Sequence, residues 1–346
     1  MSSLTTSLTH LLGVRTPIIS APMAGASGGA LAGAVGQGGG FGFLQAGYNG
    51  AEKLKEELET ARSTLKVSSL EHAAIGVGFI AWILEEGGPS SFDLLKVPLQ
   101  NRVKAIWLAF GNDLGRWVSY IRDYDRQRAD GHKTIIFVQL SSVEEALTAA
   151  NDWKVDVLVA QGIESGGHGR ASAPPLLTLI SSLVEVVPKE GPPIVAAGGL
   201  ANGAHIAACL TLGASGVAMG TRFLLTPESL YTDAQRKALI AAGPNSTIRT
   251  FAFDRARGTL GWPTGIDGRA LMNQTVKDLE AGVPIEDVQQ AFSQAVQNGD
   301  PNRMLVWAGT GVSLMNQVKG AAALVAELHQ EAVAHLRRAS QIVSAA

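Results

Sequence analysis

Short apolar runs recur up to residue 219, and between them lie segments whose apolar residues are spaced as in a helix. Such alternation of buried strands with helices is typical of βα units and a parallel sheet. The predicted strands cover residues 17–21, 41–45, 74–80, 105–110, 134–139, 155–160, 193–197 and 216–219. The predicted helices cover residues 28–36, 51–65, 92–100, 114–128, 143–151, 174–186 and 203–212.

Eight strands that are apolar throughout and joined by helices favour a (β/α)8 TIM barrel over an open sheet. A doubly wound sheet is the alternative, and its first strand should lead into a G-x-G-x-x-G turn. No such turn follows residues 17–21. We therefore predict an α/β fold of the TIM-barrel type.

The alternation stops after Met219. Helical segments without a comparable rhythm of strands are predicted at 232–241, 271–281 and 285–296. A long alanine-rich helical pattern then covers residues 312–342. We interpret residues 1–225 and 309–346 as the barrel, and residues 226–308 as a smaller helical domain inserted after strand eight. Below, residues 226–308 are called the insertion.

Glycine is frequent: the chain has 40 glycines in 346 residues, about 12% against a typical 7%. The glycines gather near the ends of predicted strands, at residues 36–42, 76–78, 162–169, 198–203 and 213–220. Glycine lets a ligand approach the backbone closely, because no side chain stands in the way. The pattern therefore predicts a ligand site at the strand ends.

The ends of the seventh and eighth strands resemble a phosphate site. Ala197, Gly198 and Gly199 end one strand, and Gly220 and Thr221 end the next. Loops at these two places commonly bind phosphate in TIM barrels, where free N–H groups at a helix start attract an anion. Each loop alone could be an ordinary βα turn, but the two together predict a phosphate site.

Residues 161–170, QGIESGGHGR, put His168 among glycines after the sixth strand. A histidine in such a segment is poorly suited to a packed core and well suited to face a ligand. Its imidazole can exchange protons or bind an anion near neutral pH. We interpret Glu164 as orienting this segment and Arg170 as a surface or loop-anchoring charge.

Composition excludes several classes of protein. Lys and Arg number 28 against 30 Asp and Glu, which argues against a nucleic-acid-binding surface. No apolar stretch is long enough to span a membrane, and no secretory signal pattern is found, so a cytoplasmic location is expected. The single cysteine, Cys209, can form neither an internal disulfide nor a thiolate zinc site. The histidine spacing recommends no metal site, and no G-x-S-x-G serine motif is present.

Four segments together resemble the nitronate monooxygenase family, formerly called 2-nitropropane dioxygenases. They are PIISAPMAGAS at 17–27, QGIESGGHG at 161–169, PIVAAGGLANGAHIAACLTLGASGVAMGTRF at 193–223 and AGTGVS at 308–313. The resemblance covers nearly the whole chain in the expected order. It implies an FMN-dependent barrel whose flavin lies across the strand ends and whose insertion covers the substrate.

The resemblance also assigns site residues. The implied FMN-binding residues are Pro22, Met23, Ala24, Gln139, Gly166, Ala197, Gly198, Gly199, Gly220 and Thr221. His168 falls on the catalytic histidine of the family. Gln139 stands where many relatives have a lysine near the pyrimidine edge of the flavin. A neutral amide should stabilise the anionic reduced flavin less than a cation would.

The implied reaction is oxidation of an alkyl nitronate, or a nitroalkane, by dioxygen to a carbonyl compound and nitrite. His168 would bond the anionic nitro group, or remove the α-proton of a neutral nitroalkane. Phe251, Phe253 and Trp262 of the insertion are candidates for the apolar wall. The implied partners are these small molecules and dioxygen, and a homo-oligomer is compatible with the sequence.

Other functions fit parts of the pattern. An FMN-dependent NAD(P)H-driven reductase of enoyl or quinone substrates shares the glycine loops and the histidine. An inosine monophosphate dehydrogenase would need its cysteine on a loop near the substrate, whereas Cys209 is predicted on an outer helix. A barrel that binds a phosphorylated ligand without turnover is the non-catalytic alternative.

Overall fold

The computed structural model describes residues 3–68 and 73–342. Eight parallel strands close into a barrel in the order β1-β2-β3-β4-β5-β6-β8-β9. They are β1 (Ile18–Ser20), β2 (Phe41–Gln45), β3 (Ala73–Ile80), β4 (Val103–Ala109), β5 (Ile135–Leu140), β6 (Val157–Gln161), β8 (Ile194–Ala197) and β9 (Gly216–Met219). The predicted TIM barrel is confirmed, and every predicted strand overlaps an observed one.

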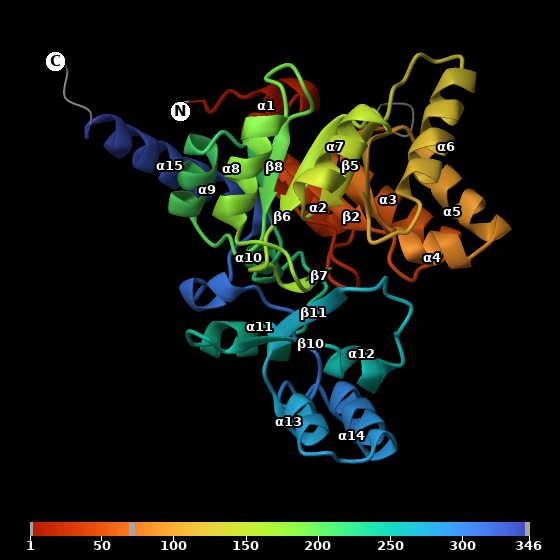
Figure 1. The fold of residues 1–346 in the computed structure, drawn as a ribbon, viewed down its shortest axis with the longest axis vertical. Helices are drawn as coiled ribbons and strands as arrows, with labels where there is room; N and C mark the ends of the chain where they lie inside the picture. Colours follow the sequence, from red (N-terminus) through yellow and green to blue (C-terminus); the bar gives the residue numbers. More distant parts are fainter. Residues whose placement is uncertain (1–2, 69–72, 343–346) are drawn as a thin grey trace.

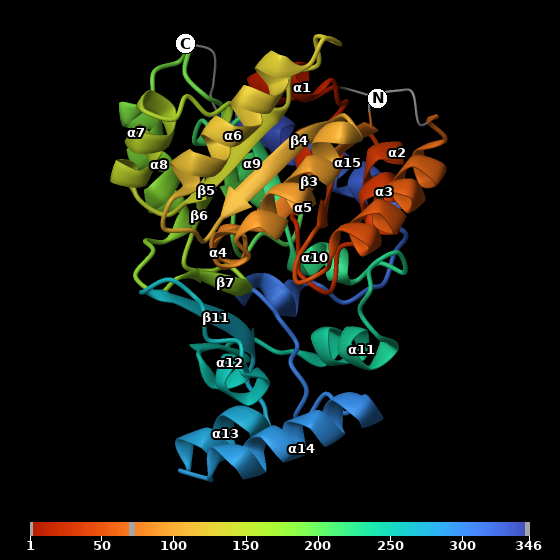
Figure 2. The same ribbon diagram turned by 90° about the vertical axis from the view of Figure 1, so that its right-hand side faces the viewer.

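Helices surround the barrel, as Figures 1 and 2 show. They are α2 (Gly29–Gln37), α3 (Ala51–Leu65), α4 (Ala81–Glu86), α5 (Pro89–Gln100), α6 (Leu114–Gln127), α7 (Val143–Asn151), α8 (Leu176–Val186), α9 (Gly203–Thr211) and α10 (Thr221–Leu224). A short helix that the sequence analysis did not predict, α1 (Ser7–Leu12), precedes β1 and begins with a capping box between Thr6 and Thr9. No helix in the described ranges is both long and apolar enough to cross a bilayer.

Aromatic rings fill the barrel interior. Phe43 of β2 contacts Trp107 of β4 and Phe137 of β5 edge to face, at centroid distances of 5.2 and 5.1 Å. A Cβ at Gly76 of β3 would lie 2.1 Å from the Phe43 ring, so this glycine makes room for packing. Likewise, a Cβ at Gly42 would lie 2.1 Å from the carbonyl oxygen of Ala32. These two glycines serve the fold, unlike the ligand role that the sequence analysis assigned to their clusters.

The insertion contains strands as well as helices. Its elements are α11 (Asp233–Ala241), β10 (Thr247–Thr250), α12 (Ala252–Arg257), β11 (Ile266–Leu271), α13 (Gln274–Glu280) and α14 (Ile285–Asn298). A further strand, β7 (Gly167–Arg170), follows β6, and the three form an antiparallel sheet in the order β10-β11-β7. This sheet joins the insertion to the barrel (Figure 2). The predicted helical insertion therefore also carries two strands, β10 and β11, which the sequence analysis did not identify.

The predicted helix at 271–281 begins later than expected. Residues 266–271 alternate between buried and half-buried positions, which is the period of a strand. The helix α13 starts only after Asn273, whose side chain accepts a hydrogen bond from the Thr275 N–H at 3.1 Å.

The C-terminal helical pattern is also shorter than predicted. Residues from 312 begin within a 3-10 helix, η1 (Thr310–Leu314), and α15 (Ala321–Ser340) starts after Gly320. Both carboxylate oxygens of Glu228 lie 3.1 Å from the Ala321 N–H, so they cap the start of α15. α15 then packs against α9 and α2 on the outside of the barrel.

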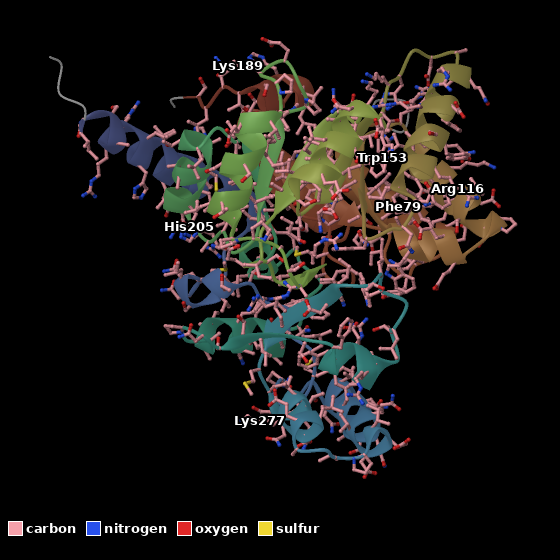
Figure 3. All side chains as sticks on the ribbon, viewed as in Figure 1. Phe79, Arg116, Trp153, Lys189, His205 and Lys277 are labelled. Atoms are coloured by element: carbon pink, nitrogen blue, oxygen red, sulfur yellow. The ribbon has the colours of Figure 1, made fainter. Side chains whose placement is uncertain are left out.

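The insertion lies at the carboxyl ends of the barrel strands. In Figure 3, Lys189, in the loop that leads into β8, lies at the opposite end of the molecule from Lys277 in α13. Phe79, near the carboxyl end of β3, lies between them. The space between barrel and insertion is therefore where the loops after the strands meet the inserted segment.

Candidate active site

A cavity of about 580 Å³ lies at the carboxyl ends of the strands and is lined by residues of both the barrel and the insertion. Its wall includes Gln45, Phe79, Trp107, Gln139 and Gln161 from the barrel strands. From the insertion and the segment after it come Tyr231, Gln235, Arg257, Trp262, Phe292, Val296, Met304, Leu305, Trp307, Gly309 and Met315. The cavity is thus a largely apolar hollow with several amide groups and one guanidinium, a composition typical of small-molecule sites.

All the predicted site residues line this one cavity. They are Pro22, Met23, Ala24, Gln139, Gly166, His168, Ala197, Gly198, Gly199, Gly220 and Thr221. They come from five separate segments of the chain, which only the closed barrel brings together. Their individual roles remain predictions.

The two glycine loops turn bare backbone toward the cavity. Gly198 and Gly199 have φ angles of +117° and +69°, a region that favours glycine. A Cβ at Gly199 would lie 2.7 Å from the Cβ of Glu164, whereas at Gly220 it would meet nothing closer than the Met23 sulfur at 3.5 Å. The N–H groups of Gly199 and Gly220 donate to no other group within the described ranges. Two donors are therefore free to bind an anion in the cavity.

Thr221 connects these loops to the segment after the insertion. Its hydroxyl oxygen accepts a hydrogen bond from the Gly309 N–H at 2.9 Å. The hydroxyl hydrogen of Thr221 is then available to a ligand. Gly309 belongs to the AGTGVS motif, so this motif is hydrogen-bonded to one of the predicted phosphate loops.

His168 lies in β7, opposite Gly268 of β11. Its Nε2 lies 3.1 Å from each carboxylate oxygen of Asp254 in α12. Asp254 is fully buried. Its Oδ1 also accepts hydrogen bonds from the Thr259 hydroxyl at 2.9 Å and from the Trp262 indole N–H at 3.2 Å. The predicted catalytic histidine is therefore held by a buried carboxylate that the sequence analysis did not identify.

Two tryptophans enclose the imidazole. Trp262 stacks on His168 with ring centroids 3.4 Å apart and planes inclined by 12°. Trp307 meets the same ring edge to face at 4.9 Å and 65°. A Cβ at Gly268 would lie 2.5 Å from the Trp307 ring, so only glycine fits opposite His168 in this sheet. Both indole rings come from outside the barrel strands.

Burial and charge act on His168 in opposite directions. Burial lowers the pKa of His168 below its ordinary value of 6.5, because the charged form loses its hydration. The hydrogen bond and negative charge of Asp254 oppose this change. The positive charges of Arg257 and Arg249 add to the lowering of the pKa. The net result is an imidazole that is neutral near pH 7 and can accept a proton.

A chain of amides links Gln139 to His168. The Gln139 Nε2 donates to the Gln161 Oε1 at 2.9 Å, and the Gln161 Nε2 donates to the His168 carbonyl oxygen at 3.3 Å. Gln139, at the position where the resemblance implies a lysine in many relatives, is an uncharged amide that is already hydrogen-bonded to Gln161. These two hydrogen bonds connect strands β5 and β6 to the backbone of His168.

The three aromatic candidates of the insertion have different positions. Trp262 lines the cavity, but Phe251 is 44% exposed and Phe253 is fully buried in the core of the insertion. Tyr231 and Trp307 were missed. The Tyr231 hydroxyl accepts a hydrogen bond from the Trp307 backbone N–H at 2.9 Å, and so fixes the segment that carries this indole.

The secondary interpretations hold. The Glu164 carboxylate accepts hydrogen bonds from the Leu176 N–H at 3.1 and 3.0 Å, so it orients the segment before His168. Arg170 pairs with Glu145 at the surface. Cys209 is buried in α9, and burial raises the pKa of its thiol to about 12. A thiol in that state on an outer helix is not a nucleophile.

A second hollow, of about 610 Å³, lies in the insertion between α11 and α13. It shares no residue with the first cavity. Among the described residues that line it, only Lys237 and Lys277 are charged, and neither is buried. Its described lining contains no recognisable arrangement of reactive groups.

The sequence matches known proteins along nearly its whole length. The family model described as nitronate monooxygenase matches residues 5–67 and 88–331. Nitronate monooxygenase npaC of Metarhizium robertsii is 35% identical over 338 residues, which cover 92% of this chain and 91% of that protein. A nitronate monooxygenase of Neurospora crassa is 31% identical over 350 residues, with 93% and 90% covered.

Solved structures of other proteins share the fold of this chain. The nitroalkane oxidase from Streptomyces ansochromogenes superposes with a TM-score of 0.76 at 28% identity, covering 97% of this chain and all of that one. FabK from Thermotoga maritima superposes with a TM-score of 0.79 at 24% identity and 99% coverage, a likeness that concerns the fold alone. The resemblance seen in the sequence is confirmed: the chain belongs to the nitronate monooxygenase family, whose members are flavin-dependent oxidoreductases.

Proposed function

We propose that this protein uses FMN to oxidise alkyl nitronates with dioxygen, giving a carbonyl compound and nitrite, and that it also accepts neutral nitroalkanes. The observation that carries the proposal is the position of His168. Its imidazole is held by Asp254 and enclosed by two indole rings, and it lies on the wall of the cavity that the glycine loops also line. Burial lowers the pKa of His168 and so favours the neutral form that can accept a proton.

The chemistry of the cavity wall fits FMN. The free N–H groups of Gly199 and Gly220, with the Thr221 hydroxyl, match a phosphate group. The Ser165 hydroxyl is buried, lines the cavity and has no hydrogen-bond partner within the described residues. A buried orphan hydroxyl suits a polar ligand. Pro22, with the neighbouring Met23 and Ala24, would line the isoalloxazine ring, Gly166 would contact it from another side, and Gln139 would lie near its pyrimidine edge.

When bound, FMN would supply the redox chemistry between the nitronate and dioxygen. The residues of the chain bind and orient the substrate. His168 bonds the nitro group of a nitronate or takes the α-proton of a neutral nitroalkane at Nδ1, because Nε2 is engaged by Asp254. Trp262, Trp307 and Phe292 form apolar walls that exclude water from the alkyl part of the substrate.

The visible spectrum of the purified full-length protein tests this proposal. A yellow protein whose absorption is bleached by a small alkyl nitronate in the absence of oxygen and of nicotinamide supports it. A yellow protein that is indifferent to nitronate but bleached by NADH or NADPH would instead support a reductase of enoyl or quinone substrates. A colourless protein that takes up no added FMN contradicts the choice of cofactor. The cytoplasmic location and the homo-oligomer remain predictions from the sequence.

A further inference from the structure

We propose that Asp254 is the positioning residue of this site: it fixes His168 with a proton on Nε2 and thereby makes Nδ1 the atom that exchanges a proton with the substrate. The inference rests on the proposed function, in which His168 takes the α-proton of a nitroalkane. It adds to that function the group that decides the protonation state of the imidazole.

The hydrogen bonds around Asp254 determine the direction of each proton. An indole N–H can only donate, so Oδ1 of Asp254 accepts from Trp262. The Thr259 hydroxyl donates to the same oxygen. Asp254 is therefore the acceptor of this cluster, and its two oxygens lie at equal distances of 3.1 Å from Nε2 of His168. A neutral imidazole that donates from Nε2 has its lone pair on Nδ1.

The pair forms only when the insertion docks on the barrel. His168 lies in β7, which follows barrel strand β6, and Asp254 lies in α12, 86 residues later. The sheet of β7, β11 and β10 brings the two segments together, and α12 directly follows β10. The insertion therefore supplies one half of a proton-transfer pair as well as the apolar wall.

A neutral nitroalkane needs this device and a nitronate does not. When the α-proton moves to Nδ1, the electrons of the C–H bond stay on the substrate as the nitronate, and no oxidant takes part. The imidazolium that forms has the Asp254 carboxylate at Nε2 and the Trp262 ring against its face. Both stabilise a cation. A substrate supplied as the nitronate has already lost that proton.

The charged groups around His168 determine whether its pKa should rise or fall when Asp254 is replaced. From α12, Asp254 faces it directly and Arg257 acts from farther away. From β10, Arg249 acts on it and is itself paired with Asp267 of β11. Tyr48 lies beside Arg257. Of the described groups that act on His168 directly, only Asp254 raises its pKa, so replacing the carboxylate with an amide should lower that pKa further.

Nitrogen-15 NMR of the full chain as purified tests the inference without any turnover. We expect His168 to carry its proton on Nε2 in the wild type, with its signal assigned by loss in His168→Gln. In Asp254→Asn we expect the proton to move to Nδ1, because the amide can donate to Nε2, or the pKa of His168 to fall. A wild-type imidazole protonated on Nδ1, or an Asp254→Asn spectrum unchanged in tautomer and pKa, would overturn the inference.

Thr259→Val provides a second test that does not depend on the folding of Asp254→Asn. Without the hydrogen bond from the Thr259 hydroxyl, the Asp254 carboxylate should accept a stronger hydrogen bond from His168. The pKa of His168 should therefore rise, opposite to the effect of Asp254→Asn. A fall or an unchanged pKa in Thr259→Val would count against the inference.

Kinetics separate the inference from the proposed function. We expect Asp254→Asn to lower kcat/KM for a neutral nitroalkane by about 100-fold or more, and for the matching nitronate by much less. The control is Asp278→Asn. Asp278 lies in α13, outside the cavity, and pairs with Arg303, so its replacement should change neither value. No turnover of either substrate by the wild type, with the expected NMR result, would refute the proposed function while leaving the positioning of His168 intact. Nitronate turnover with NMR spectra insensitive to Asp254 would overturn the inference alone.

Discussion

Trp262 stacks on the imidazole of His168 at 3.4 Å and also donates its indole N–H to Asp254, the hydrogen-bond partner of the same imidazole. One residue of the insertion thus fixes both the plane of the histidine ring and the carboxylate that bonds to it. The segment 259–262 is therefore part of the reactive site, although it lies far along the chain from the barrel strands.

Replacing Trp262 should separate its two roles. We expect Trp262→Ala to lower kcat/KM for a neutral nitroalkane by about 10- to 100-fold, since it removes both the stacked face and the N–H donor. Trp262→Phe keeps an aromatic face and should lose less. Steady-state kinetics measure the difference. Trp153→Phe, on a tryptophan outside the cavity wall, is the control (Figure 3), and equal losses in all three variants would contradict this account.

The pH dependence of activity should reflect the lowered pKa of His168. Because the base must be neutral, kcat/KM for a neutral nitroalkane should rise with pH through an apparent pKa below the 6.5 of an ordinary histidine. A rise centred above that value would mean that burial does not govern this imidazole.

Stability should change with pH in the same range. A histidine whose pKa is lower in the folded state binds fewer protons there than in the unfolded state. The free energy of unfolding therefore increases as pH rises from the lowered pKa to about 6.5. Urea unfolding of the wild type and of His168→Gln measures this pH dependence of the free energy of unfolding. The dependence should be smaller in the variant, which lacks the imidazole of His168. His205, whose pKa burial also lowers, is present in both proteins and cancels.

Gly199→Ala should weaken FMN binding. The residue has a φ of +69°, and the added Cβ would lie 2.7 Å from Glu164, so the loop must shift. We expect the Kd for FMN to rise about 10-fold or more, corresponding to about 1.4 kcal/mol. Gly131→Ala is a matched control, because Gly131 also has a φ of +69° but no atom of the described residues lies within 4 Å of the added Cβ. Similar FMN affinities in the two variants would contradict the phosphate assignment.

Gln139→Lys should raise the reduction potential of bound FMN. A cation near the pyrimidine edge stabilises the negative charge of the reduced form better than the amide does. A spectroelectrochemical titration measures the potential, and the exposed Gln127→Lys on α6 is the control for an added charge. An unchanged potential in Gln139→Lys would mean that this side chain does not face the flavin.

The barrel could be predicted from the sequence because its strands are buried on both faces and therefore read as continuous apolar runs. The short strands β7 and β10 could not. Gly167–Arg170 consists of glycines and polar residues, and Thr247–Thr250 has only four residues, all half-buried. Their stability comes from pairing with β11, which local patterns do not record. The alternation of Ile266, Gly268 and Ala270 was a usable signal for β11.

Only the site residues that belong to sequence motifs were predicted. His168 and the glycine loops stand next to barrel strands, so their position followed from the fold. Asp254 looks like any acidic residue in the first turn of a helix, and nothing in the sequence indicates that it meets a histidine 86 residues away. Trp307 and Tyr231 were missed for the same reason: tertiary packing alone brings them to the cavity.

The most direct test of the proposed function is the consumption of dioxygen by the FMN-loaded protein with a small alkyl nitronate and no nicotinamide, with nitrite measured in the same samples. The account predicts nitronate-dependent oxygen uptake with nitrite release, and its loss by about 100-fold or more in His168→Ala. Oxygen uptake and nitrite release that are absent in the wild type, or unchanged in His168→Ala, would contradict it.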